Sequence, residues 1–394
     1  APYALSGKDT TKRLNRFLQR VGEAPVIFDT LQAKRTEENI LSAVNNQGWL
    51  DAKIEQKTKT KGKKIKVIYL IEPGRRYTVR DICYNIPDTA LANIIISENV
   101  RSLMRIGMPF DLNILDEERL RISRLLQNSG YYKFNKEYVR FIADTCVGNH
   151  EVDLEMVIPL YQANEKSTPV PHKKYNVASI SYVSNVPLAD LNARINELDS
   201  IHHKGSPIYF NKKLSLRPTV FTNNNVIEIG DVYKESKVQR SYSNYGQLGA
   251  VMFSNIMMVE KDTTKNELDC LIALHENKKR SFGAEVEGTN SAGDLGAALS
   301  LTYQNRNIFK GSELFFMEFR GAFEAITGLE GYADQNYLEF SIEAGLTFPN
   351  FKLFKFNGRE RGLVRSTTEL SLLYDTQNRP EFHRRVLTGS LRYR

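Results

Sequence analysis

The amino-acid sequence predicts an α+β protein: repeated βααββ modules, followed by antiparallel strands of a transmembrane β-barrel that is incomplete in this chain. Two patterns lead to this prediction. A strand-like segment at Tyr77 recurs 98 positions later at Tyr175, and helical patterns follow each copy. After residue 280, six runs alternate apolar with small or polar residues, as strands between lipid and water do.

Composition excludes several other classes of protein. The chain has 394 residues, 41% of them hydrophobic and 25% charged, which excludes a disordered chain. No run of about 18 uncharged apolar residues occurs, which excludes a transmembrane helix. Cys83, Cys146 and Cys270 lie far apart, so neither a disulfide scaffold nor a zinc site is predicted. The chain begins Ala-Pro-Tyr, and we expect that any targeting signal was removed or never included.

Positive charge concentrates at the N-terminal end, where residues 1–80 hold 17 Lys or Arg and 8 Asp or Glu. The densest part, Lys57–Lys66, contains a glycine and lies between two strand-like segments, which is typical of a β-hairpin. A nucleic-acid or anionic-membrane patch is the alternative. Because no aromatic residue among these lysines offers a stacking surface for bases, we favour a solvated hairpin tip and expect no nucleic-acid partner.

Each copy of the repeat opens with a strand. Tyr77–Tyr84 and Tyr175–Tyr182 alternate apolar with other residues, and each ends near an Asn/Pro break. Two basic residues precede each copy.

Two helices and two strands are predicted to follow the first of these strands. A short apolar stretch over Leu91–Ile106 precedes a helix over Asp116–Asn128, and Gly130 ends that helix as a left-handed stop. Strands over residues 138–143 and 152–158 complete the module.

The other two copies keep this order. The copy from Tyr175 ends in strands over residues 252–260 and 267–275. The N-terminal copy has two helices, a stop at Gly48 and two strands, whereas its opening strand would precede Ala1. The helical faces of the copy from Tyr175 are formed by Leu188, Leu191, Ile195 and Leu198 and then, after an insertion, by Val238, Tyr242 and Tyr245.

The helix–Gly–aromatic step over Leu126–Tyr132 and the entry Pro73–Tyr77 resemble polypeptide-transport-associated (POTRA) domains of the Omp85 superfamily. A tandem ferredoxin-like protein is the plainer alternative. The resemblance implies POTRA modules over residues 75–165 and 172–279, and a POTRA-like module without its first strand over residues 1–74.

Residues 280–394 hold the six alternating runs, each of about 8 to 12 residues, close to what a tilted strand needs to cross a bilayer. A soluble antiparallel sandwich also alternates, but its strands average about five or six residues. We therefore favour the first strands of an outer-membrane barrel. The candidate lumen-facing charges in these runs are Glu318, Arg320, Glu339, Glu343, Glu369 and Arg392.

The resemblance extends into this region, because Tyr303–Gly311 is similar to the turn between the second and third barrel strands of the Omp85 superfamily. Gly22–Val26 and Leu120–Ile122 most resemble the outer-membrane component of the translocation and assembly module, in its lipid-anchored variant. Family barrels have sixteen strands, whereas this chain has about six, and an open edge in lipid leaves backbone groups unpaired. We therefore expect a fragment of a longer barrel. The family's Arg-Gly-Phe loop finds no counterpart here.

The sequence gives little support to catalysis. It contains no phosphate loop, nucleophile elbow or HExxH motif. His202 and His203 have no metal-ligating neighbours in the sequence, so we interpret them as loop histidines. Asp116–Glu118 is predicted to stand at a helix start, where carboxylates favour the positive end of the dipole. We expect no enzyme, no metal and no cofactor.

The resemblance implies an outer-membrane protein assembly factor of a Gram-negative-type cell, with POTRA modules in the periplasm. POTRA edge strands would capture unfolded outer-membrane protein clients by strand addition, and the barrel would template their insertion into outer-membrane lipid. A periplasm-spanning bridge protein (TamB-like) is a further implied partner. The candidate gate strand, where the barrel would open, consists of Phe282, Gly283, Ala284, Glu285, Val286, Glu287 and Gly288.

Three alternatives stay open at this point. A two-partner secretion transporter and a phospholipid-transfer component share the arm and the barrel. A soluble β-rich adhesin or carbohydrate-binding module belongs to a different class. Such a protein would be extracted in the aqueous phase without detergent.

Overall fold

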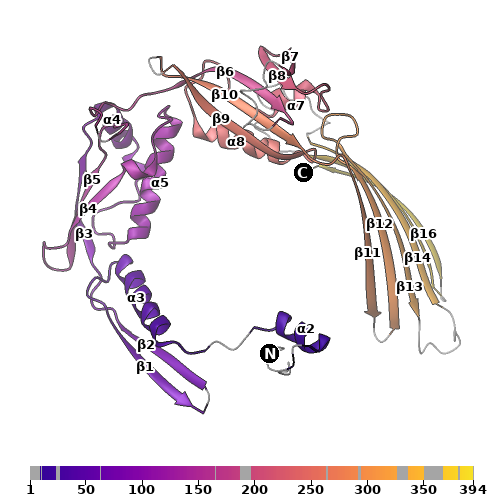
Figure 1. The fold of residues 1–394 in the computed structure, drawn as a ribbon, viewed down its shortest axis with the longest axis horizontal. Helices are drawn as coiled ribbons and strands as arrows, with labels where there is room; N and C mark the ends of the chain where they lie inside the picture. Colours follow the sequence, from indigo (N-terminus) through magenta and orange to yellow (C-terminus); the bar gives the residue numbers. More distant parts are fainter. Residues whose placement is uncertain are drawn as a thin grey trace. The chain divides into compact units, whose positions relative to one another are not determined.

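A computed structural model describes residues 9, 11–23, 27–62, 64–164, 166–186, 197–262, 265–291, 294–325, 336–349, 367–379 and 382–393. The chain divides into two compact units, and Figure 1 labels their helices and strands. The first unit comprises residues 1–123 and 135–171, and the second unit comprises residues 124–134 and 172–394. Among the described residues, no helix is both long and apolar enough to cross a membrane.

The first unit begins with two helices and a hairpin. These elements are α2 (Arg13–Val21), α3 (Thr30–Asn46), β1 (Lys53–Lys61) and β2 (Lys64–Glu72). The side chain of Asp29 caps α3 by accepting a hydrogen bond from the Leu31 amide at 2.8 Å. Residues of β1 and β2 pair from Lys53 with Glu72 to Lys61 with Lys64, so the predicted hairpin over the lysine-rich segment is confirmed.

The rest of the first unit follows the predicted order of strand, helix, helix, strand and strand. Its elements are β3 (Thr78–Asn85), α4 (Thr89–Ser97), the 3-10 turn η1 (Asn99–Arg101), α5 (Leu112–Asn128), the 3-10 turn η2 (Lys136–Tyr138), β4 (Arg140–Asp144) and β5 (Glu151–Val157). The sheet order is β3-β5-β4, with β3 parallel and β4 antiparallel to β5. Leu91 and Ile95 of α4, Ile122 of α5 and Leu154 of β5 are buried in its core. The residues of α5 after Ser123 belong to the second unit.

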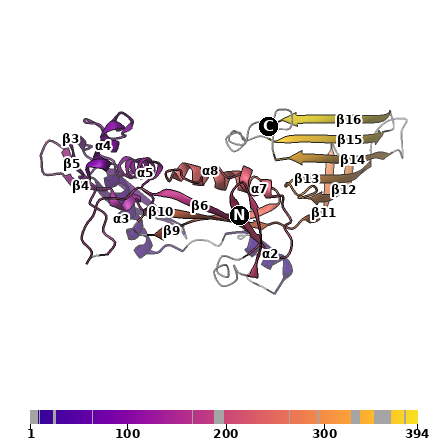
Figure 2. The ribbon, with the colours of Figure 1, turned by 90° about the horizontal axis from the view of Figure 1, so that it is seen from above.

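The second unit contains a five-stranded sheet. Its elements are β6 (Asn176–Ser184), β7 (Asp199–His203), β8 (Ser206–Phe210), α7 (Pro218–Asn223), α8 (Glu235–Gly246), β9 (Val251–Asp262) and β10 (Glu267–Glu276). The strand order is β7-β8-β6-β10-β9, and α8 lies along β9 (Figures 1 and 2). The predicted insertion forms β7, β8 and α7, and β8 pairs with β6. Leu188, Leu191 and Ile195 of the predicted first helix lie outside the described residues.

The six alternating runs all form strands of one antiparallel sheet, in which each strand pairs with the next along the chain. Figure 1 shows these strands side by side. The described strands leave the sheet open at its first and last members, so closure into a barrel stays a prediction. The strands are β11 (Arg280–Ser291), β12 (Asp294–Asn305), β13 (Leu314–Ala325), β14 (Asn336–Phe348), β15 (Thr368–Asn378) and β16 (His383–Tyr393).

Candidate functional site

One face of the six-stranded sheet exposes large apolar side chains along every strand. On β13, Met317 is 44% exposed and Phe319 is 40% exposed. Successive side chains of a strand point to opposite faces, so the strand pairings bring these residues onto one surface. An apolar surface of this extent fits lipid or another apolar partner. The same face carries Phe282, Val286, Leu299, Leu301, Phe323, Phe340, Ile342, Leu370, Leu372, Leu387 and Leu391.

The opposite face carries the charges that the sequence predicts to face a lumen. Arg320 of β13 pairs with Glu287 of β11 at 2.9 Å, reaching past the small residues of β12 that lie between them. Two further predicted residues, Glu369 and Arg392, pair across β15 and β16 at 3.2 Å. The structure thus brings oppositely charged groups together on the face turned away from the apolar side chains.

The remaining predicted lumen residues lie on the same face. Glu318 of β13 stands directly opposite Glu343 of β14, and Glu339 lies further along β14. Like charges directly opposite each other destabilise a sheet unless water or a cation screens them. This arrangement therefore fits a wet surface better than a dry core.

The predicted gate strand lies within β11, which is the first edge strand of this sheet. It is longer than the sequence pattern indicates, because β11 pairs with β12 without a break from Arg280 to Ser291. Gly283 and Gly288 bring no large side chain to this edge, and a Cβ at Gly288 would meet no atom within 4 Å. The role of this strand as a gate stays a prediction.

A joint in the first unit links the end of α3 to the strand β3. The Gly48 carbonyl accepts a hydrogen bond from the Tyr77 amide at 2.8 Å. Arg76 lies over the Trp49 ring, with its guanidinium carbon 4.5 Å from the ring centroid. Gly48 has a φ of +92°, and a Cβ there would lie 2.1 Å from the Phe110 carbonyl oxygen. Both the backbone angle and this close approach require glycine.

The second unit contains the same joint. The Gly130 carbonyl accepts a hydrogen bond from the Tyr175 amide at 2.9 Å, and Gly130 has a φ of +105°. Lys174 lies over the Tyr131 ring, with its ammonium nitrogen 5.4 Å from the ring centroid. In both units, a basic residue before the repeat therefore lies over the aromatic residue that follows the stop glycine.

An ion pair adds to the second joint. Lys133 lies 2.7 Å from Glu260 of β9, and the Tyr175 hydroxyl donates to the same carboxylate at 2.8 Å. The hydrogen bond from Lys133 holds the pKa of Glu260 below its ordinary value. The same bond raises the pKa of Lys133, so both groups are charged at neutral pH.

Replacing Gly48 by alanine should destabilise the first unit by about 2 kcal/mol or more, because the strained backbone angle alone costs about 1–3 kcal/mol. The added Cβ would also displace the Phe110 carbonyl. Gly148 is the matched control, since its φ is +86° and a Cβ there meets no atom within 4 Å. Urea unfolding of both alanine variants measures the difference. Equal losses for the two variants would show that the close approach at Gly48 contributes nothing.

The turn between β12 and β13 packs against residues near α7 and before β9 within the second unit. Arg217 forms an ion pair with Glu313, which is only 3% exposed. The Gly311 amide donates to the other oxygen of the same carboxylate at 2.8 Å. The Ala250 amide donates to the Ser312 hydroxyl at 2.9 Å. A buried carboxylate with these donors holds the turn in place.

The segment Tyr303–Gly311, which carries the family resemblance, comprises the end of β12 and most of this turn. The Arg217 amide donates to the Lys310 carbonyl at 2.7 Å, and the Asn307 side chain donates to the Ser215 carbonyl at 3.1 Å. Lys310 also takes a left-handed conformation, with a φ of +61°. Arg217 gave no signal in the sequence, because its partner lies 96 residues away.

Replacing Arg217 by alanine should weaken the attachment of this turn by about 1.5–3 kcal/mol, the range for a hydrogen bond to a charged group. The loss stays within this range because Arg217 is itself half-exposed and the Gly311 amide still binds Glu313. Lys204, whose partner among the described residues is the neutral side chain of Asn223, serves as the control for loss of a positive charge. Limited proteolysis between residues 306 and 313 measures the effect. Unchanged cleavage in the Arg217→Ala variant would contradict a role for the ion pair.

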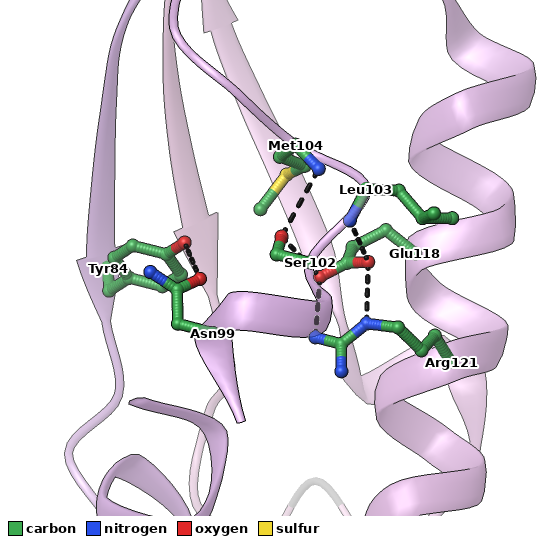
Figure 3. A network of polar contacts seen from close by, with 7 residues as sticks. All are labelled: Tyr84, Asn99, Ser102, Leu103, Met104, Glu118 and Arg121. Carbon is green, nitrogen blue, oxygen red and sulfur yellow. Dashed lines mark hydrogen bonds and ion pairs between the residues drawn. The ribbon is translucent and has the colours of Figure 1, made fainter. Parts of the chain in front are cut away.

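Figure 3 shows a buried polar network around Glu118 of α5. Glu118 is 1% exposed, and Nη2 and Nε of Arg121 donate to its carboxylate at 2.7 and 2.8 Å. The Ser102 hydroxyl and the Leu103 amide donate to the same carboxylate at 2.9 and 3.0 Å. The network therefore fixes the segment that follows η1 against α5.

The position of Glu118 corrects the prediction that Asp116–Glu118 stands at a helix start. Helix α5 begins at Leu112, so Glu118 lies in its interior rather than at the positive end of the dipole. Burial raises the pKa of Glu118, but the bonds from Arg121, Leu103 and Ser102 outweigh it and hold that pKa below its ordinary value. The carboxylate is structural in this unit.

The described residues contain no group of three or more histidine, cysteine, aspartate or glutamate side chains that could hold a metal ion. His202 and His203 lie on β7, and the His203 ring is 3.1 Å from the Thr222 hydroxyl. The histidines predicted to lie in a loop therefore lie on a strand.

No protein-family model and no curated protein matches this sequence. Among solved structures, BamA from Haemophilus ducreyi lacking POTRA domains 1–3 is similar at 13% identity and a TM-score of 0.38. The match covers 80% of this chain and 58% of that one, so this chain spans a little over half of its length.

Two further structures are similar over large parts of the chain. POTRA domains 3–5 of BamA from Haemophilus influenzae match at 15% identity and a TM-score of 0.36, over 64% of this chain and 84% of that one. CdiB from Acinetobacter baumannii matches at 10% identity and a TM-score of 0.32, over 94% of this chain and 68% of that one. At these identities and TM-scores, the likenesses establish neither the fold nor the activity of this chain.

Proposed function

We propose that this protein is an outer-membrane protein assembly factor of the Omp85 type. The two-faced sheet of β11 to β16 is the observation that carries the proposal. Its apolar face fits lipid chains, and its opposite face holds charges that fit water. The strands are 11–13 residues long, which is sufficient to cross a bilayer when tilted.

In this proposal, residues 1–74, 75–165 and 172–279 form POTRA modules of a periplasmic arm, and residues 280–394 form the first strands of a barrel in the outer membrane. The βααββ order of the first unit from β3 to β5 supports the modular arm. The edge strands β3 and β4 of the first unit offer main-chain groups to an extended client chain, which needs no fixed client sequence.

The edge strand β11 is the gate strand in this proposal. Its release requires the main-chain bonds to β12 to open and the ion pair between Glu287 and Arg320 to break. Within the Omp85 superfamily, we assign the protein to the outer-membrane component of the translocation and assembly module, on the basis of the sequence resemblance. A periplasm-spanning bridge protein (TamB-like) is the partner that this assignment implies.

Reconstitution of the intact protein into lipid vesicles tests the proposal. A urea-unfolded outer-membrane barrel protein serves as the client, and its folded fraction is measured over time by gel mobility without heating. The expected result is faster folding of the client than in empty vesicles. Removal of residues 1–279 should abolish the gain in rate while leaving the barrel strands in the membrane.

Two results would contradict the proposal. Recovery of the intact protein in the aqueous phase without detergent would support a soluble adhesin or carbohydrate-binding module instead. An unchanged rate of client folding, together with release of one specific substrate outside the cell, would favour a secretion transporter.

A further inference from the structure

Strand β9 is an edge strand of the five-stranded sheet: ten of its 12 residues pair with β10, and no other described strand pairs with it. An edge of this length offers unpaired N–H and C=O groups to any extended chain. Tyrosine hydroxyls, however, bond to main-chain groups in the middle of this edge.

Tyr242 of α8 takes the place of a neighbouring strand beside Ile256. The Ile256 amide donates to the Tyr242 hydroxyl at 2.7 Å, and the same hydroxyl donates to the Ile256 carbonyl at 3.0 Å. In an antiparallel pair, both main-chain groups of one residue point to the same side, so both groups of Ile256 point away from β10. One hydroxyl therefore occupies the two groups that an added strand would use.

Tyr132 covers the next outward position of β9. Its hydroxyl donates to the Met258 carbonyl at 3.0 Å. Its ring packs edge-to-face against Tyr175 and Tyr233, with centroid distances of 5.9 and 5.1 Å, which fixes the hydroxyl at the strand. The ion pair with Lys133 then holds Glu260, the following residue on this side of the strand.

The other side of the β6-β10-β9 core is covered as well. Strand β8 pairs with β6, from Tyr182 opposite Ile208 to Ser184 opposite Phe210. In the first unit, by contrast, β3 occupies the matching position and is itself an edge strand. The second unit thus pairs the end of β6 with an added strand, whereas in the first unit only the first residues of β3 pair with a further segment, residues 107–110.

We propose that Tyr242 and Tyr132 close the β9 edge against strand addition, so that an extended chain can pair there only after both hydroxyls have moved away. The inference rests on the proposed function, because capture of client chains by strand addition is the process that a closed edge controls. An added strand must first replace three hydrogen bonds, each worth a factor of about five in an equilibrium constant.

Hydrogen exchange in the full chain, held in detergent micelles, tests the closure without any client. The Ile256 amide should be protected in the unmodified protein, and it should exchange about fivefold or more faster in the Tyr242→Phe variant. The Tyr132→Phe variant should leave this amide protected, because Tyr132 binds only a carbonyl. Tyr209→Phe, on β8, is the matched control. Equal exchange of the Ile256 amide in the unmodified and Tyr242→Phe proteins would overturn the proposal.

A photoreactive peptide tests the consequence for strand addition. The probe is the 13-residue sequence of β14, NYLEFSIEAGLTF, with a benzophenone at its N-terminus. Cross-links are mapped by mass spectrometry. Cross-links to residues 251–262 should rise about 25-fold in Tyr242→Phe, which frees two bonds, and about fivefold in Tyr132→Phe, which frees one. Tyr209→Phe should not change them.

The outcomes separate the two proposals. If the peptide binds elsewhere on the chain but its cross-links to β9 do not rise in either variant, closure of this edge by tyrosine is wrong. If Ile256 exchange changes as expected but the peptide cross-links to no part of any variant, the closure is supported and client capture by strand addition is wrong.

Discussion

Replacing Glu118 by alanine should destabilise the first unit by about 3–5 kcal/mol, the cost of breaking a buried charged pair. The loss should fall towards the lower end of that range, because the Arg121 side chain keeps a fifth of its surface exposed and can bind water. The Ser102 hydroxyl and the Leu103 amide would lose their acceptor, so the segment after η1 would loosen. Exchange of the buried amide of Leu154 measures the loss, because only unfolding of the sheet exposes it.

Acid provides an independent check on the same carboxylate. The folded-state pKa of Glu118 lies below its ordinary value of 4.5, so its contribution to stability is present above that pH and is lost as the pH falls through the folded pKa. The gap in stability between the unmodified protein and Glu118→Ala should therefore shrink in acid. The adjacent and exposed Glu117 is the control, and its alanine variant should change stability little. A gap that stays constant from pH 7 to the acid limit would contradict the charged network.

If β14 crosses a membrane as proposed, replacing Ile342 by arginine should destabilise the inserted protein by about 2–4 kcal/mol, the cost of a lipid-facing arginine near the bilayer midplane. Ile342 lies in the middle of β14, is 47% exposed and has Phe319 and Tyr374 opposite it on the neighbouring strands. The fraction of intact protein that resists urea extraction from membranes measures the effect.

Glu343 is the matched control, because it is the next residue of β14 and points to the other face. Glu343→Arg should be tolerated or slightly stabilising, since it would replace the like-charge pair with Glu318 by an attractive one worth about 0.2–1 kcal/mol. If Glu343→Arg lowers the membrane-bound fraction as much as Ile342→Arg does, the two faces do not differ and the membrane interpretation fails.

The strands and helices were largely predictable, because their signals are local. Apolar alternation in β13 and β14 depends only on neighbouring residues, and the helical face of α8 repeats within a few turns. The stop glycines Gly48 and Gly130 were equally predictable from the sequence, because a left-handed residue after a helix is a local requirement. The starts of elements were harder to predict: α5 begins at Leu112, four residues before Asp116, and Leu112 is exposed, so it lies off the apolar face that marked the helix.

The sequence by itself therefore determined the order of elements, the two faces of β11 to β16 and the repeat that relates Tyr77 to Tyr175. Only the tertiary structure decided which residues that are distant in the sequence come into contact. It pairs Gly130 with Tyr175, Tyr242 with the edge at Ile256, and Arg217 with Glu313. The physical reason is that periodicity reports which face of an element is apolar, whereas a hydrogen bond between distant residues depends on where folding brings two elements together, and no local pattern records that position.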